Sequence, residues 1–249
     1  MTSQRKSAIW VGVLYIVATV AGIASVGPSG TLTGGPGILV NAAAHESDLI
    51  VLVLLNLVMA VAVAGVAFMI YPILKQDADT ETKQGLALWY VGTRITEGAV
   101  FVVAILATLS LLTLSQEFAS AGSPVGSYHQ TAAVVLEDVG NFGWSLGQSV
   151  FSVGAAMLYY LLYVSKRVPR WISVWGLVAT PLFLAASLSL LFTGDPNSTV
   201  SSVLYAPLGL QEMVLAVWLI FKGFRPASSS VGLPIGRGVV RAGASGGTA

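Results

Sequence analysis

Two charged residues three positions apart, Arg94 and Glu97, lie in the middle of an apolar stretch that runs from Leu86 to Leu114. A stretch of this length is typical of a membrane-spanning helix, and an ionisable side chain inside one needs a partner. A guanidinium and a carboxylate one helical turn apart can form an ion pair on one helix face. The pair could therefore bind a charged solute, relay a proton, or only stabilise the bundle.

Six apolar segments account for most of the chain, and each could cross a hydrocarbon core of about 30 Å as a helix. They span residues 8–26, 49–74, 86–114, 141–164, 171–192 and 203–221. Their continuous apolar runs lack the alternation of an outer-membrane β-strand. The sequence therefore predicts an all-α, polytopic bundle of six transmembrane helices over residues 1–225. Residues 226–249 are rich in Gly, Ser and Ala, so we expect a disordered cytoplasmic tail there.

The composition excludes several classes of protein. Hydrophobic residues make up 55% of the chain and charged residues 9%, whereas soluble domains have about 25% charged residues. The chain has no cysteine, which excludes disulfides, thiolate nucleophiles and zinc or iron–sulfur sites of the cysteine type. A net charge of +1 is too balanced to attract nucleic acid. Membrane lipid is therefore the expected surrounding of the chain.

The basic residues predict an orientation. Of the twelve Lys and Arg residues, all but Arg94 lie before the first segment, after the last, or between the second and third or the fourth and fifth. The other three connections carry acidic residues and no Lys or Arg. By the positive-inside rule, both termini are expected in the cytoplasm. The first segment also resembles a secretory signal, but it exceeds the usual apolar core of about 7–15 residues. We expect an uncleaved anchor; cleavage would leave five helices.

Depth along the helices adds a third charged residue. At about 1.5 Å per residue, Arg94 lies about 12 Å and Glu97 about 16 Å from the cytoplasmic start of their helix. Glu212 lies about 13 to 14 Å from the cytoplasmic end of the last helix. We expect Arg94 and Glu212 to pair across two helices, with Glu97 as a second partner. One carboxyl then lacks a counter-charge and would hold a proton or a cation. In the alternative, this triad only joins helices and the second carboxyl stays neutral.

Three amides lie inside the predicted spans, namely Asn56, Gln148 and Gln211. They could line the same cavity as the triad and take part in a ligand or proton site. Interhelical hydrogen bonds would equally explain each of them. The sequence is compatible with both roles.

The residues of common active sites are not placed for catalysis. Both histidines, His45 and His129, fall outside the spans, and the chain has no H-E-x-x-H motif. No Gly-rich phosphate loop opens a helix, and no His or Lys is placed as a base for a serine within a span. We therefore expect no enzyme activity, no catalytic residue, no cofactor and no metal site.

Four motifs in order resemble a known family. They are the runs 71–75 (YPILK), 94–98 (RITEG), 158–171 (a Tyr- and Leu-rich helix end followed by Pro169, Arg170 and Trp171) and 212–224 (EMVLAVW leading into Lys222, Gly223 and Phe224). In this order and spacing the chain resembles the bacterial membrane proteins grouped as domain-of-unknown-function family number 4386. The resemblance implies a six-helix, multi-pass protein of a prokaryotic plasma membrane. It also implies recurrent motif positions for Arg94, Glu97 and Glu212, but no activity.

Two function classes remain. In the first, the protein binds or moves a small solute, proton or lipid at the triad. In the second, it is a non-transporting membrane scaffold or regulatory partner whose charges are structural ion pairs. A homo-oligomer is compatible with both, because small residues on the fourth span would let another helix approach closely. These residues are Gly140, Gly143, Gly147, Gly154 and Ala155.

Overall fold

The computed structural model describes residues 3–30, 37–122, 128–193 and 199–226. These residues form seven helices: α1 (Ser3–Ser29), α2 (Ile38–Ala44), α3 (Glu46–Gln76), α4 (Glu81–Ser120), α5 (Tyr128–Ser165), α6 (Arg170–Thr193) and α7 (Thr199–Phe221). All but α2 are long and apolar enough to cross a membrane. No strand occurs in the described ranges, so the predicted all-α transmembrane bundle is confirmed. The expected disordered tail, residues 226–249, lies outside the described ranges apart from its first residue.

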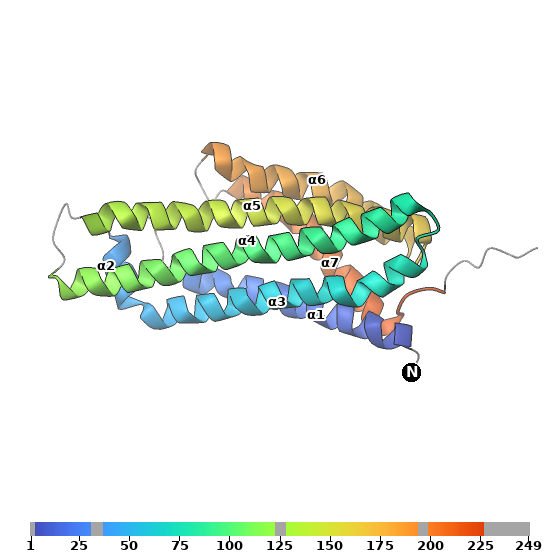
Figure 1. Cartoon of the computed structure of the whole chain (residues 1–249), viewed down its shortest axis with the longest axis horizontal. Helices are drawn as coiled ribbons and strands as arrows, with labels where there is room; N and C mark the ends of the chain where they lie inside the picture. The colour runs from blue at the N-terminus through green and yellow to red at the C-terminus, as the bar shows by residue number, and fades with distance from the viewer. Residues whose placement is uncertain (1–2, 31–36, 123–127, 194–198, 227–249) are drawn as a thin grey trace, which may run out of the picture.

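The six long helices pack as a ring in the order α1, α3, α4, α5, α6 and α7, and α7 packs back against α1. The start of α1, the end of α7 and the α3–α4 and α5–α6 connections lie at one end of the bundle (Figure 1). We call this the basic end, because the Lys and Arg residues in the described ranges, apart from Arg94, gather there, and we call the opposite end the acidic end. The ring order places α4 across the bundle from α7.

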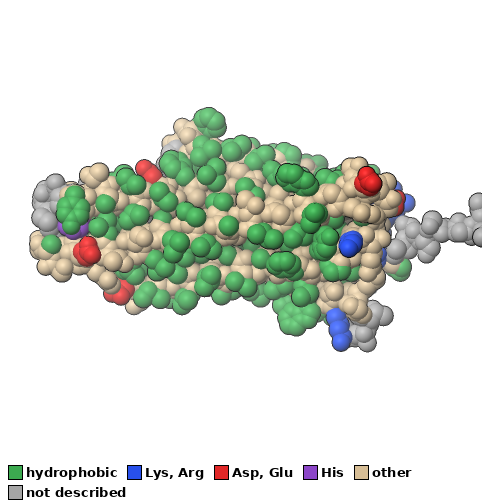
Figure 2. Space-filling view, in the orientation of Figure 1, with side chains coloured by type: hydrophobic (Ala, Val, Ile, Leu, Met, Phe, Trp, Pro, Cys, Tyr) green, Lys and Arg blue, Asp and Glu red, His purple; other side chains and the backbone are tan. Residues whose placement is uncertain are grey.

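The outer surface fits a membrane between these two ends. Figure 2 shows hydrophobic side chains over the middle of the face drawn, with Lys and Arg at the basic end. Exposed large hydrophobic residues occur on all six long helices. The protein is therefore a multi-pass membrane protein. The side of the membrane on which the basic end lies stays a prediction of the positive-inside rule.

Helices α4 and α5 are much longer than their apolar runs. With 40 and 38 residues they extend about 60 Å, whereas α6 and α7, with 24 and 23 residues, extend about 35 Å. The excess projects at the acidic end, where α2 packs on it (Figure 1). Ile38 and Leu39 of α2 share a buried cluster with Leu111, Phe118 and Ala133. The predicted span 141–164 begins 13 residues after α5 does, because hydropathy marks where a helix leaves lipid and not where the helix ends.

Buried apolar side chains concentrate in the half of the ring near the basic end. The largest cluster takes residues from all six long helices, including Val11 of α1, Leu74 of α3, Tyr90 of α4, Leu158 of α5 and Leu215 of α7. At an estimated 25 cal/mol per Å² of buried apolar surface, such a cluster dominates the stability of this half. The basic-end half of the ring is therefore a packed core.

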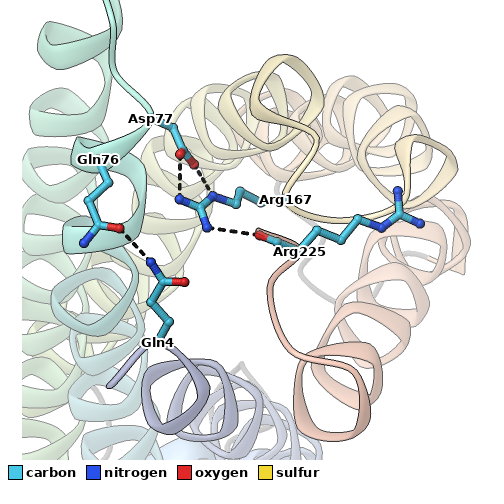
Figure 3. Close-up of polar contacts among 5 residues, drawn as sticks. All are labelled: Gln4, Gln76, Asp77, Arg167 and Arg225. Carbon is cyan, nitrogen blue, oxygen red and sulfur yellow. Dashed lines mark hydrogen bonds and ion pairs between the residues drawn. The ribbon is translucent and has the colours of Figure 1, made fainter. Parts of the chain in front are cut away.

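A hydrogen-bonded network closes the basic end over this core (Figure 3). Arg167 donates from Nε and Nη2 to the two carboxylate oxygens of Asp77, at 2.5 and 2.6 Å, and from Nη1 to the carbonyl of Arg225 at 3.0 Å. The backbone N–H of Arg225 donates back to the carbonyl of Arg167 at 2.8 Å. Gln4 donates to Gln76 at 2.8 Å beside it. We call the contacts of Arg167 with Asp77 and Arg225 the basic-end latch; it joins three segments that follow α3, α5 and α7.

Arg167 differs from what its place in a basic loop indicates. Only 1% of its surface is exposed, whereas a basic loop residue is expected to reach water. The sequence showed Arg167 only as one of several loop cations and gave no sign that Asp77 would be its partner. At the same end, Arg5 donates to the last carbonyls of α7, on Leu219 and Ile220, at 3.1 and 2.6 Å. A cation at a helix C-terminus offsets the negative end of the helix dipole.

The close approach of α5 and α6 generates a stability prediction. A Cβ atom added at Gly176 would lie 2.5 Å from the ring of Tyr159, which is fully buried and cannot move aside. We expect Gly176→Ala to lower the free energy of unfolding by about 1–3 kcal/mol, the usual cost of overpacking. Thermal melting of the purified protein measures this. Gly92→Ala is the matched control, since an added Cβ there meets nothing within 4 Å; equal melting temperatures of the two variants would contradict the packing.

The basic-end latch generates a second prediction. Asp77→Asn leaves the buried Arg167 without its counter-charge, which typically costs about 3–5 kcal/mol. Asp79→Asn is the matched control two residues away, because Asp79 pairs with Lys83 at 2.6 Å on the surface with 69% of its side chain exposed. Surface pairs of this kind contribute about 0–1 kcal/mol. We expect a large drop in melting temperature for the first variant and almost none for the second; similar drops would show that the latch does not hold the fold.

Candidate functional site

Arg94 and Glu97 form an ion pair inside α4, as their spacing predicts. The Nη1 atom of Arg94 lies 3.0 Å from Oε2 of Glu97, and each residue is 2% exposed. The guanidinium carbon also lies 4.8 Å from the ring centre of Phe151 on α5, within the range of a cation–π interaction. The positive charge of Arg94 is therefore met from within its own helix and by a neighbouring ring.

Glu212 does not form the expected ion pair with Arg94. Within the described residues, the ion pair of Arg94 is with Glu97, and Glu212 acts on the guanidinium at longer range. The reason is the ring order, because α4 packs against α3 and α5 whereas α7 packs against α6 and α1. Equal depth did not imply contact, because α4 and α7 face each other across the bundle.

A cavity of about 1040 Å³ fills the space between these opposed helices. All six long helices contribute to its wall, and Arg94, Glu97 and Glu212 all line it. Its lining continues to the exposed residues Ser29 and Asp138 near the acidic end. Ligand cavities of proteins usually measure about 300–1,000 Å³, so a small molecule has room here. The triad therefore lies at the inner end of a cavity, with the packed core between it and the basic end.

Glu212 differs from Glu97 in its access to this cavity. Glu97 is almost fully buried, whereas Glu212 is partly exposed although it lies deep within a membrane-spanning helix. Since both ends of α7 are distant, the exposed part of Glu212 faces the cavity that it lines. Its carboxyl has no ion-pair partner within the described residues. It is the group of the triad best placed to meet a ligand or a proton.

Three tyrosines surround the triad, and the sequence did not single them out as site residues. Tyr15 of α1, Tyr90 of α4 and Tyr159 of α5 are 4%, 1% and 0% exposed. Each interacts electrostatically with both Arg94 and Glu212. Tyr159 is completely buried, although a tyrosine near the end of a membrane-spanning helix is typical of the membrane interface. The spacing of Tyr90 and Arg94, one helical turn apart, was a signal that could have found one of the three.

The three amides divide between the cavity and the helix contacts. Asn56 of α3 and Gln148 of α5 line the cavity, and the Oε1 atom of Gln148 accepts a 2.7 Å hydrogen bond from the hydroxyl of Tyr205. Gln211 is fully buried, is not part of the cavity lining, and donates to the backbone carbonyl of Ile172 on α6 at 3.0 Å. Its role is the interhelical hydrogen bond that its chemistry allows.

The electrostatics of the cavity are dominated by carboxylates. Among its described lining residues, Arg94 is the one cation, whereas Glu97 and Glu212 lie near the inner end and Glu137 and Asp138 lie near the acidic end. Glu97 balances Arg94, which leaves an excess of negative charge along the cavity. A low-dielectric surrounding strengthens every such interaction. The arrangement can therefore attract a cation, or take up and release a proton at Glu212.

Comparison with known proteins agrees with this architecture. No curated protein matches the chain, and no solved structure matches it. A family model does match, over residues 10–223, which includes the six membrane-spanning helices apart from the first seven residues of α1, and every residue of the triad. The resemblance drawn from the four motifs is thereby confirmed. The chain belongs to the family described as Domain of unknown function (DUF4386).

Proposed function

We propose that the protein binds a small solute in its central cavity and moves it across the membrane, with Glu212 exchanging a proton or the solute. The observation that carries the proposal is that one cavity reaches from the acidic end of the ring to the carboxyl of Glu212. A packed core and the basic-end latch lie between this carboxyl and the other end. A carrier that is open on one side and closed on the other has this arrangement of parts.

The geometry of the ion pair favours this function over that of a scaffold. A structural ion pair that holds a bundle together would join two helices, whereas Arg94 and Glu97 both belong to α4. Their burial is costly and gives no direct helix-to-helix bridge. Contacts that do join helices are made by other residues, such as Gln211 with Ile172. The charges of the triad therefore fit a binding site better than a set of structural ion pairs between helices.

Charge balance supports the exchange of a proton or a cation at the carboxyl of Glu212. One guanidinium and two carboxyls carry a net negative charge if all are ionised, and a membrane interior strongly disfavours an uncompensated charge. The groups that face Glu212 are Arg94 and Glu97 of α4 and the hydroxyls of Tyr15, Tyr90 and Tyr159. None of these is a second cation. A proton or a bound cation on Glu212 would restore neutrality, and the two would compete for it.

The proposal also includes the orientation of the protein in the membrane and its surroundings. The basic end lies in the cytoplasm by the positive-inside rule, so the cavity opens to the outside of a prokaryotic plasma membrane. The protein acts as a binding and transport protein and not as an enzyme. Membrane lipid surrounds the ring. A homo-oligomer stays compatible with the proposal, but Gly143, Gly147 and Gly154 pack against α4 of the same chain and are not free to meet a second copy.

Access to the cavity is tested with single cysteines, because the natural chain contains none. Gly209 of α7 lines the cavity and its added Cβ meets nothing within 4 Å, whereas the adjacent Leu210 is 61% exposed on the outer surface. In open membrane fragments, we expect a membrane-impermeant thiol reagent to label Gly209→Cys and not Leu210→Cys, since a thiol in lipid stays unreactive. Mass spectrometry measures the labelling. Labelling of both or of neither would contradict a water-accessible cavity, and sealed right-side-out vesicles then show which side it faces.

Proton exchange at Glu212 is tested by charge movement in reconstituted membranes. A pH jump applied to the protein on a solid-supported membrane should give a transient current in the wild type, because protons enter or leave the buried carboxyl. We expect Glu212→Gln to abolish the current while the protein still folds. Glu117→Gln is the matched control, since Glu117 is an exposed carboxylate of α4 outside the cavity lining. A wild-type current no larger than that of empty membranes would overturn the exchange.

A further inference from the structure

We propose that the solute bound in the central cavity is a monovalent organic cation with an aromatic or aliphatic body. It is held by the carboxylate of Glu212 and by the aromatic side chains of the cavity wall. This inference names the substrate class of the cavity and rests on the proposed function of that site.

The sign of the solute follows from which charges are already paired. Arg94 is 2% exposed, lies 3.0 Å from Glu97 and carries the ring of Phe151 against its guanidinium. An anion would have to displace a carboxylate to reach it. Glu212 is open to the cavity and has no cationic partner within the described residues. A cation entering from the acidic end would pass further carboxylates on its way, those of Glu137 and Asp138.

Aromatic rings line the cavity in two groups. Phe183 of α6 lies 5.1 Å from Phe151 and 4.6 Å from Tyr205 between ring centres, so this group spans α5, α6 and α7. Phe101 of α4 lies 4.3 Å from Trp144 of α5. All five residues belong to the cavity lining. The negative faces of aromatic rings attract cations, and this is the usual way in which proteins recognise ammonium groups.

The rest of the lining favours an organic cation over an inorganic one. Hard inorganic cations prefer six or more oxygen ligands, whereas the inner end of this cavity offers two carboxyls, one of them paired with Arg94. Apolar side chains occupy much of the remaining wall, including Met59, Val63 and Leu111. They would bury the body of a lipophilic cation and gain about 25 cal/mol per Å² of apolar surface. The chemistry of the wall therefore fits an amine, a quaternary ammonium or a phosphonium with a bulky apolar body.

A pair of probes with one shape and opposite charge separates charge from hydrophobicity. Isothermal titration calorimetry of the purified full chain is carried out with tetraphenylphosphonium and with tetraphenylborate, using protein-free micelles as the blank. We expect binding of the cation and no comparable binding of the anion. We also expect cation binding to weaken as the pH is lowered, because a proton on Glu212 competes with the probe while the facing Arg94 keeps its charge.

Three variants assign the binding to these residues. Glu212→Gln should weaken binding of tetraphenylphosphonium at least tenfold, and Glu117→Gln should leave it unchanged. Phe183→Leu keeps an apolar side chain but removes the central ring of the larger aromatic group, and should weaken cation binding by about 2- to 30-fold. Because Phe183→Leu changes no charge, it tests the proposal even if Glu212→Gln fails to fold. Thermal melting checks the fold of each variant.

The results that would overturn the cation proposal differ from those that would overturn proton exchange at Glu212. Equal binding of the two probes, or no binding of the cation, would overturn the cation proposal. If the pH-jump current is nevertheless present and depends on Glu212, proton exchange stands without an organic cation. Cation binding that depends on Glu212 and Phe183, in a protein without a pH-jump current, would support the binding site and overturn proton exchange.

Discussion

Holding Arg94 inside a membrane-spanning bundle is the constraint to which the rest of the site responds. A guanidinium at this depth requires a counter-charge and shielding from lipid. The ion pair with Glu97 supplies the first, and the interior of a six-helix ring supplies the second. Because both residues of the ion pair belong to α4, Arg94 needs no carboxylate from another helix. Glu212, on the opposite wall, is thereby left with a carboxyl that nothing in its own helix neutralises.

The half of the bundle near the basic end is tightly packed, whereas the half near the acidic end contains the cavity. In the basic-end half, all six long helices contribute to one buried core, and Arg167 and Asp77 join the segments beyond it. In the other half, the same helices line a cavity that contains charged and aromatic side chains. Tight packing requires small residues at close contacts, such as Gly176 against Tyr159. The stability of the packed half permits the other half to remain hollow.

The fold could be predicted from the sequence to a large extent because a membrane imposes strong local rules. Lengths of apolar runs define the spans, and the charged residues inside them identify the candidate site. The pairing of Arg94 with Glu97 could be predicted because their spacing is local. Ring order is not a local property, and so the expected ion pair of Arg94 with Glu212 was wrong although the depths were compared. Tyr159 could not be assigned to the site for a related reason, since a tyrosine near a helix end can face lipid or the core, and only its neighbours decide. Asp77 and Arg167 are separated by a whole helical hairpin, and no spacing rule relates them.

The unequal lengths of the helices give the entrance of the cavity a direction. Helices α4 and α5 continue well past the ends of α6 and α7, and α2 supports them there. A solute at the acidic end thus meets a tall wall on one flank and a low rim on the other. Glu137 and Asp138 belong to the tall wall, so their charges stand beside the path of approach and above the rim. If the proposed organic cation enters from this end, the longer α4–α5 wall would hold carboxylates beside its route to Glu212.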